Sequence, residues 1–203
     1  MIAVIDYGAG NIFSVKNALG FLGFTGKLTG DAADIRAADK LILPGVGAFP
    51  DAMRMLTERG LTDVIRAEAA GGKPLLGICL GMQILFERGY EFEETRGLGL
   101  IEGYVDKLTP PAGENLKIPH MGWDSVEIIN PLPLTKTVSS GTTMVYFVHS
   151  YKAVTPRENI SLLARYGQDV PALVFRGSVY GAQFHPEKSG EAGLNILRSF
   201  AEL

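Results

Sequence analysis

Cys79 lies where a short apolar run meets a helical pattern, which is the setting of an activated nucleophile. The run over 74–78 predicts a strand that leads straight into the cysteine. Gly77 and Gly81 stand two residues away on either side, which permits the tight turn that exposes a nucleophile between a strand and a helix. The helix N-terminus favours the thiolate, and the Leu80 N–H can donate to an oxyanion. A buried structural thiol is the alternative for a lone cysteine.

A thiol that attacks a carboxamide needs a base to take its proton and return it to the leaving ammonia, and histidine suits this task. His185 stands at the carboxyl end of an expected strand, and Glu187 could hydrogen-bond its imidazole and fix the tautomer. A plain surface turn is the alternative for this His-Pro-Glu motif. We interpret His149 as structural or substrate-lining, and His120 as a loop histidine near a surface aromatic. No spacing typical of a metal site occurs, so we expect neither a metal nor a cofactor.

The segment Gly45-Val46-Gly47 follows another expected strand. Its two glycines free the backbone to present N–H groups toward a ligand. Together with the Leu80 N–H, such a group would form a two-donor oxyanion hole. A phosphate cradle is a weaker interpretation, because the Lys-Ser/Thr ending and the Gly-x-Gly-x-x-Gly spacing are both missing. A simple β-turn is the remaining alternative.

The elements that must position these groups alternate along the first half of the chain. Strands are expected at 2–5, 40–43 and 74–78, and helices at 11–22, between Gly47 and Gly71, and from Cys79 through Phe86. Asn11 is a candidate cap of the first helix. Short apolar strands separated by helices indicate a parallel sheet covered on both faces, and right-handed crossovers would make it open and doubly wound.

The second half of the chain is richer in strands and turns. Strands are expected at 100–105, 125–129, 144–150, 160–165, 172–175 and 179–183. Turn-rich segments at 109–115 and 130–133 separate some of them. We expect these strands to be antiparallel or mixed additions to the sheet, followed by a last helix capped by Ser189. The chain is thus expected to form one α/β domain over residues 1–203, with a mostly parallel sheet.

Composition excludes several other classes of protein. The formal net charge is −3 and no Lys/Arg cluster occurs, so neither nucleic acid nor a membrane is an expected partner. One cysteine cannot form an internal disulfide or a multi-cysteine zinc site. No signal peptide or bilayer-length apolar run is recognised, and we expect a reducing, cytoplasmic location.

The motifs around Gly45, Cys79 and His185 resemble those of the class I (triad) glutamine amidotransferases in order and spacing. Further segments at 6–11, 120–123, 146–151 and 184–189 look like the glutaminase subunits of imidazole glycerol phosphate synthases, which serve histidine biosynthesis. The resemblance extends from end to end. Ile78 stands where valine is common in the family, a β-branched swap of similar shape.

The resemblance implies a role for each matching residue. Cys79 would form a glutamyl thioester, His185 would act as general base and then acid, and Glu187 would orient it. The matching substrate and oxyanion positions are Gly45, Val46, Gly47, Leu80, Gln83, Ser150 and Tyr151. Gln83 would hold the substrate glutamine, the 150–151 backbone would meet its amino acid head group, and a peptide of the oxyanion strand would flip to aim its donor.

The resemblance also implies a partner. In the family, a separate (β/α)₈-barrel cyclase receives the ammonia and makes imidazole glycerol phosphate and an aminoimidazole carboxamide ribotide, and the two subunits form a heterodimer. Asn11, Trp123, Tyr146 and Lys188 match positions at or near that interface. The chemistry agrees, because free ammonia protonates and diffuses away unless an acceptor is docked.

Other functions remain open from the sequence. A glutaminase subunit for pyridoxal phosphate synthesis would share the triad, although the pattern around Trp123 and 146–151 is not expected there. A cysteine peptidase or chaperone-like member of the fold would cleave peptides without preferring glutamine. A non-catalytic binding module would keep a fossil site, but all three members of the triad are present.

Overall fold

The computed structural model describes residues 1–109, 111, 113 and 116–203. Its elements in chain order are β1 (Ile2–Ile5), α1 (Ile12–Phe21), β2 (Gly26–Thr29), α2 (Ala32–Ala37), β3 (Lys40–Gly45), α3 (Phe49–Glu58), α4 (Leu61–Ala70), β4 (Leu75–Cys79), α5 (Leu80–Gln83), β5 (Phe86–Gly89), β6 (Thr95–Arg96), β7 (Ile101–Lys107), β8 (His120–Ile128), η1 (Pro133–Thr135), β9 (Met144–His149), β10 (Tyr151–Val154), η2 (Arg157–Asn159), β11 (Ile160–Arg165), β12 (Asp169–Arg176), β13 (Val179–Ala182), η3 (Pro186–Lys188) and α6 (Gly190–Ala201). None of the described helices has the length and apolar character needed to cross a bilayer.

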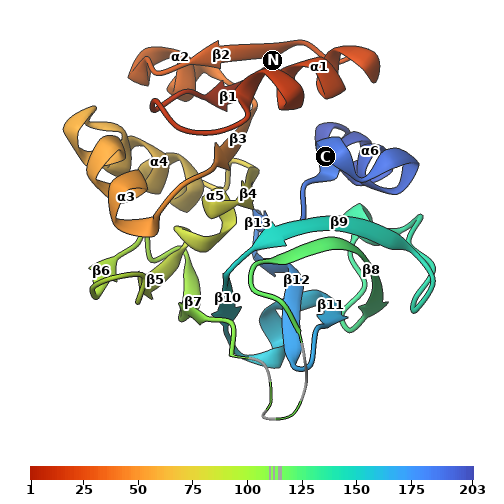
Figure 1. The fold of residues 1–203 in the computed structure, drawn as a ribbon. Helices are drawn as coiled ribbons and strands as arrows, with labels where there is room; N and C mark the ends of the chain where they lie inside the picture. The colour runs from red at the N-terminus through yellow and green to blue at the C-terminus, as the bar shows by residue number, and fades with distance from the viewer. Residues whose placement is uncertain (110, 112, 114–115) are drawn as a thin grey trace.

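A nine-stranded sheet runs through the described part of the chain in the order β2-β1-β3-β4-β13-β12-β11-β8-β9. The first five strands in this order are parallel to one another: β2, β1, β3, β4 and β13. The remaining strands, β12, β11, β8 and β9, extend the sheet with antiparallel pairs. Figure 1 shows the parallel strands among the helices and the antiparallel strands gathered at the other end of the molecule. The predicted α/β fold is thereby confirmed.

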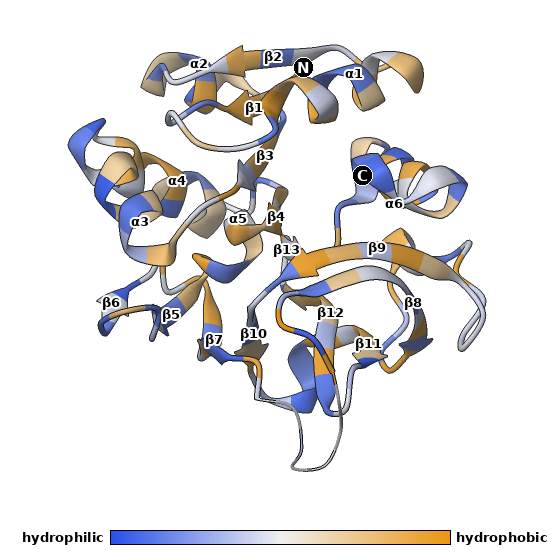
Figure 2. Ribbon diagram, in the orientation of Figure 1, coloured by the Kyte–Doolittle hydropathy of each residue, from blue (hydrophilic) through white to orange (hydrophobic). Residues whose placement is uncertain are grey.

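Side-chain alternation along the parallel strands explains why helices cover both faces. On β1, Ile2 and Val4 join the core formed with α1 and α6, whereas Ala3 and Ile5 join the core formed with α3 and α4. Because both faces are buried, these strands are continuous apolar runs rather than alternating ones, which is the orange colour of β1, β3 and β4 in Figure 2.

The first-half prediction was wrong at three places. The single helix expected before Gly71 is two helices, α3 and α4, because Gly60 adopts a left-handed conformation with φ of 67°. The helix after Cys79 ends at Gln83, and Phe86 begins a strand instead. β3 runs on through Pro44 to Gly45, two residues past the expected end. The short elements β2 and α2 were not predicted.

The sequence predicts that the second-half strands extend the main sheet, but not all of them do. β7 pairs with β10 and β5 in a separate sheet of order β10-β7-β5-β6, counted over the described residues. β8 begins at His120, so this histidine lies in a strand rather than in a loop. The expected strand at 144–150 is β9, which ends at His149, and β10, which begins at Tyr151, was not predicted. Part of the turn predicted at 109–115 lies outside the described residues.

Candidate active site

Cys79 ends β4 and immediately precedes α5, as the sequence predicts. Its backbone has φ of 55° and ψ of −112°, a strained conformation for a residue with a side chain. Such strain is typical of the strand-to-helix turn that carries a nucleophile, where it presents the side chain at the end of the strand. Cys79 is 8% exposed, and it lines a pocket instead of being sealed in the core.

The flanking glycines let the backbone of α5 lie directly on two strands. A Cβ at Gly77 would lie 2.5 Å from the Gly81 oxygen, and one at Gly81 would lie 1.8 Å from the Leu43 oxygen. Neither contact is possible for an L-residue with a side chain, so glycine is required at both positions. This close packing fixes where the first N–H groups of α5 point.

Sheet topology brings His185 beside the cysteine. β13 pairs with β4 in parallel, with Ala182 opposite Ile78, so the chain beyond β13 emerges at the same edge as Cys79. His185 Nδ1 donates to Glu187 Oε1 at 2.9 Å, and the two side chains are 3% and 1% exposed. With Nδ1 committed to the carboxylate, Nε2 is the nitrogen left for the sulfur.

The charges around His185 favour its protonated form. Burial opposes a charge on the ring, but hydrogen bonds and charges from Cys79 and Glu187 outweigh it and raise the pKa of His185 to about 9. The protonated ring therefore places a positive charge and a proton donor beside the Cys79 sulfur.

Ser189 holds this segment in place, although not as the predicted helix cap. It occupies the residue before α6, but its hydroxyl donates to the His185 oxygen at 2.6 Å and accepts from the Tyr146 N–H at 2.9 Å. The His185 N–H donates in turn to the Tyr146 oxygen at 3.0 Å. β9 therefore anchors the histidine backbone.

A pocket of about 350 Å³ opens onto the cysteine. It is lined by Val46, Gly47, Cys79, Leu80, Gln83, Glu91, Pro119, Val148, His149, Ser150, Tyr151 and His185. The structure thus brings together most of the predicted substrate positions in one place. Its volume suits a small molecule such as an amino acid.

Gln83 is fixed by its two amide N–H donors. They reach the Tyr151 oxygen at 2.9 Å and Gln183 Oε1 at 3.0 Å, which leaves the Gln83 oxygen to accept from a ligand. Gln183, fully buried, places its own Nε2 4.0 Å from the Cys79 sulfur. Sequence reasoning missed Gln183, whose signal was a polar side chain at the end of an otherwise apolar strand.

The Gly45-Val46-Gly47 segment borders the pocket as expected. Gly45 pairs with Cys79 across β3 and β4, Val46 is 46% exposed, and Gly47 has φ of 103°. A Cβ on Gly45 would lie 2.7 Å from both the Gly81 nitrogen and the Tyr7 hydroxyl. That hydroxyl is buried with no hydrogen-bond partner among the described residues. Burial, reinforced by the charge of Cys79, raises the pKa of Tyr7.

Glu91 is a pocket residue that the sequence did not indicate. Its Oε2 accepts from the Phe49 N–H at 2.8 Å, and burial raises the pKa of the carboxyl group. It comes from the loop after β5, an element that was itself not predicted, so no local pattern could have placed it here.

The predicted interface residues lie outside the pocket. Trp123 is 50% exposed and packs edge-on against Tyr146, with ring centroids 5.9 Å apart. Its ring also approaches Gly190, two residues beyond the exposed Lys188. Asn11 precedes α1, but its side chain makes no capping bond. The structure therefore groups Trp123, Tyr146 and the 188–190 segment on one surface.

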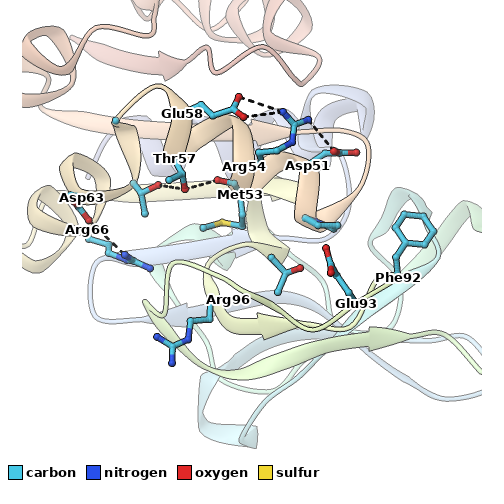
Figure 3. A pocket seen from close by; sticks show the side chains of 14 residues that line it. Asp51, Met53, Arg54, Thr57, Glu58, Asp63, Arg66, Phe92, Glu93 and Arg96 are labelled. Atoms are coloured by element: carbon cyan, nitrogen blue, oxygen red, sulfur yellow. Dashed lines mark hydrogen bonds and ion pairs between the residues drawn. The ribbon is translucent and has the colours of Figure 1, made fainter.

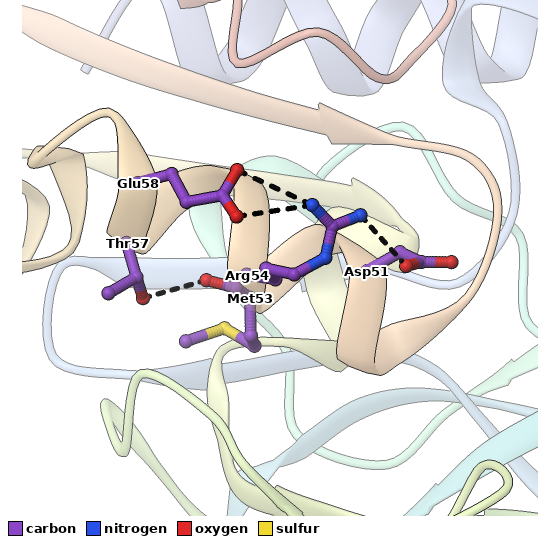
Figure 4. A network of polar contacts seen from close by, with 5 residues as sticks. All are labelled: Asp51, Met53, Arg54, Thr57 and Glu58. Carbon is purple, nitrogen blue, oxygen red and sulfur yellow. Dashed lines mark hydrogen bonds and ion pairs between the residues drawn. The ribbon is translucent and has the colours of Figure 1, made fainter.

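A larger hollow, about 760 Å³, lies between α3, α4 and the segment leading into β6 (Figure 3). Neither Cys79 nor His185 lines it. Its Arg54 already pairs with Asp51 at 3.1 Å and Glu58 at 3.2 Å, as Figure 4 shows. Exposed pairs of this kind contribute little stability, and they neutralise the charge that an anionic ligand would need.

Comparison with known proteins agrees with this geometry. The chain belongs to the glutamine amidotransferase class-I family, whose sequence profile matches residues 3–202. Two curated relatives are named imidazole glycerol phosphate synthase subunit HisH. That of Listeria monocytogenes serovar 1/2a is 50% identical over 203 residues, covering 100% of this chain and 96% of the relative. That of Streptococcus gordonii is 50% identical over 202 residues, with the same coverage.

Solved structures show the same fold at lower identity. A crystal structure of a glutamine amidotransferase superposes with a TM-score of 0.75 at 23% identity, covering 100% of both chains. The structure of PurLQS from Thermotoga maritima gives 0.73 at 24% identity, covering 99% of this chain and 97% of that one.

Proposed function

We propose that this chain is the glutaminase subunit of an imidazole glycerol phosphate synthase and that it hydrolyses glutamine through Cys79, His185 and Glu187. The observation that carries the proposal is the strained Cys79 turn, which opens into the same pocket as the buried His185–Glu187 pair. The identity of the HisH relatives over the whole chain supports the particular synthase.

In the proposed reaction, the Cys79 thiolate attacks the side-chain carbonyl of glutamine. The Leu80 N–H and a donor from the Gly45–Gly47 segment stabilise the oxyanion. His185 then donates its proton to the leaving nitrogen, so ammonia departs and a glutamyl thioester remains. Water, deprotonated by His185, releases glutamate.

The pocket wall offers groups that suit the amino acid part of glutamine. The Glu91 carboxylate matches an α-ammonium group, and the 150–151 backbone provides further hydrogen-bonding groups. The Gln83 oxygen can accept from the substrate because both of its N–H groups are engaged elsewhere. A cysteine peptidase would need an open cleft, which a pocket of about 350 Å³ does not favour.

We further propose that the chain acts as one domain, in the cytoplasm, within a heterodimer with a (β/α)₈-barrel cyclase. The surface that includes Trp123, Tyr146 and Lys188, with Asn11, would meet that subunit. Exposed aromatic side chains are enriched at interfaces, which supports this assignment.

Amide-¹⁵N glutamine supplied to the complex of this chain, the cyclase and its nucleotide tests the proposed function. The imidazole product should carry the label, and glutamine turnover should be faster in the complex than with the chain alone. An unlabelled product, or amination of a pyridoxal phosphate precursor instead, would contradict the assignment. Equal turnover with and without the cyclase would reject its activating role.

Replacing Glu187 with glutamine is expected to reduce activity roughly 100-fold less than loss of the nucleophile does, as for orienting carboxylates of other triads. The pKa of His185 is raised to about 9, so the ion pair between His185 and Glu187 is lost as the pH rises through that value. Without the carboxylate charge this pKa falls, and the alkaline limb of the kcat/KM profile should move to lower pH. The exposed Glu158→Gln variant is the control, and an unmoved limb would contradict Glu187 as the orienting group.

A further inference from the structure

Two buried histidines and an aspartate form a chain between the pocket and the surface. His149 Nδ1 meets the Tyr151 oxygen at 2.9 Å, and His149 Nε2 lies 3.1 Å from His120 Nδ1. His120 Nε2 lies 2.6 Å from Asp124 Oδ2. The histidines are 6% and 1% exposed, and the Asp124 side chain is 36% exposed.

The number of protons available fixes the protonation state of each group in this hydrogen-bonded chain. The Tyr151 oxygen can only accept, so His149 must carry its proton on Nδ1. Burial, opposed by the Tyr151 hydrogen bond, lowers the pKa of His149 to about 3, so the ring is neutral and its Nε2 accepts. His120 must then donate from Nδ1 to His149 and from Nε2 to the Asp124 carboxylate. Three hydrogen bonds need three protons, whereas two neutral rings supply two.

The additional proton belongs to the pair of His120 and Asp124. Burial, only partly offset by the hydrogen bond and charge of Asp124, lowers the pKa of His120, so the contacts determine where this proton lies. A 2.6 Å contact between two lone pairs would be repulsive, so the arrangement observed requires a proton between them. The three contacts together place a donor on both nitrogens of His120, with the additional proton lying between His120 Nε2 and Asp124 Oδ2.

The far end of the chain reaches the glutamine pocket. The Tyr151 oxygen accepts from both His149 Nδ1 and Gln83 Nε2. Gln83 in turn contacts Gln183, whose amide lies 4.0 Å from the Cys79 sulfur. The protonation of His120 is therefore coupled by contiguous hydrogen bonds to the backbone that lines the pocket.

We propose that Asp124 and His120 are positioning residues for glutamine binding, which hold His149 in the one tautomer that fixes the Tyr151 oxygen. This inference rests on the proposed glutaminase function. If His120 cannot donate, His149 is free to carry its proton on Nε2, and the Tyr151 oxygen then loses one of its two donors. The 150–151 backbone becomes less ordered, and glutamine binds more weakly while the triad keeps its geometry.

Other groups around the rings do not supply the missing proton. The phenol ring of Tyr166, from the turn after β11, stacks on His120 with centroids 4.0 Å apart, and its hydroxyl donates to the Lys117 oxygen. Phe147 of β9 also stacks on His120, with ring centroids 4.7 Å apart. His185, beyond β13, acts on His149 only through its charge.

His120→Phe tests the positioning role while keeping the ring stack. In the complex with the cyclase and its nucleotide, KM for glutamine should rise about tenfold, the loss expected for one hydrogen bond, with kcat nearly unchanged. Tyr166→Phe is the matched control, because it keeps the stack and lies outside the chain of bonds. A KM for His120→Phe within about twofold of the wild type overturns the proposal.

Asp124→Asn keeps a hydrogen bond to His120 Nε2 but removes the need for an additional proton. The asparagine amide can donate to His120 Nε2, so all three bonds form with neutral rings. The KM of the variant should match the wild type at low pH and stay lower as the pH rises, because the hydrogen-bonded chain of the wild type then loses its third proton. Identical pH dependences of KM overturn the proposal.

Nitrogen-15 NMR of the histidine side chains gives a readout that does not depend on activity, and the chain has three histidines to assign. We expect His149 to be protonated at Nδ1 and His120 at both nitrogens, with Asp124→Asn removing the proton from His120 Nε2. A His149 protonated at Nε2, or a His120 with one protonated nitrogen in the wild type, overturns the proposal. A wild-type complex that leaves glutamine intact would overturn the proposed function instead, whatever these spectra show.

Discussion

Cys79→Ala should abolish glutamine hydrolysis, lowering kcat by roughly five to six orders of magnitude as for removal of the nucleophile in other triads. The proposed reaction needs a thiolate at the strained turn, and alanine offers no atom that can form the thioester. Ammonia supplied directly should still drive synthesis by the complex, because in the proposed complex the cyclase consumes ammonia and not glutamine. Glutamine turnover and ammonia-dependent product formation, measured on the same complex, decide the matter.

Two controls make this prediction specific to the sulfur. A glutamine analogue with a reactive ketone should label the wild-type chain at Cys79 and leave the alanine variant unlabelled. Thermal unfolding should be similar in both proteins, because alanine removes one buried atom and keeps the backbone of the turn. Residual glutamine use by Cys79→Ala would show that another group is the nucleophile.

The turn that carries Cys79 could be predicted because its geometry is local. Gly77, Cys79 and Gly81 encode the strand, the turn and the helix start within five residues, so the pattern alone predicts where Cys79 lies. The pairing of Glu187 with His185 is equally local, being two residues away in the chain. Such local contacts can be predicted correctly even where the rest of the topology is predicted wrongly.

The rest of the pocket depends on strand order and register, which no short pattern carries. His120 reaches His149 because β8 pairs with β9 in a register that places these residues opposite each other. Glu91 enters the pocket from the loop between β5 and β6 of the four-stranded sheet, which the sequence did not separate from the main one. The hydrophobic pattern indicates which strands are buried, but not which strands become neighbours.

The misread helix boundaries have a similar cause. Apolar spacing continues through α3 and α4, so the pattern alone favours one helix, and the left-handed Gly60 ends the first helix without disturbing that spacing. Ser189 does precede the last helix as predicted, but its hydroxyl accepts a hydrogen bond from the Tyr146 N–H of β9 instead of capping the helix. At Ser189, a tertiary hydrogen bond thus replaced the local cap.

Gly81→Ala should be the most destabilising glycine substitution at the site. Its Cβ would lie 1.8 Å from the Leu43 oxygen and 2.8 Å from the Leu43 carbonyl carbon, and both belong to the backbone of a central strand. No side-chain rotation can relieve this clash, so α5 must move away from β3. We expect a loss of about 3 kcal/mol or more in the free energy of unfolding, the upper range for overpacked cores.

The same displacement should also harm catalysis, because Cys79 and the Leu80 N–H are set by where α5 begins. Denaturant unfolding and glutamine turnover at a temperature where the variant is folded separate the two effects. Gly20→Ala is the matched control: nothing lies within 4 Å of its Cβ position in α1, and replacing a helical glycine with alanine should stabilise the chain by about 0.5–1 kcal/mol. If Gly81→Ala were as stable and active as the wild type, the close contact between α5 and β3 could not be what aims the nucleophile.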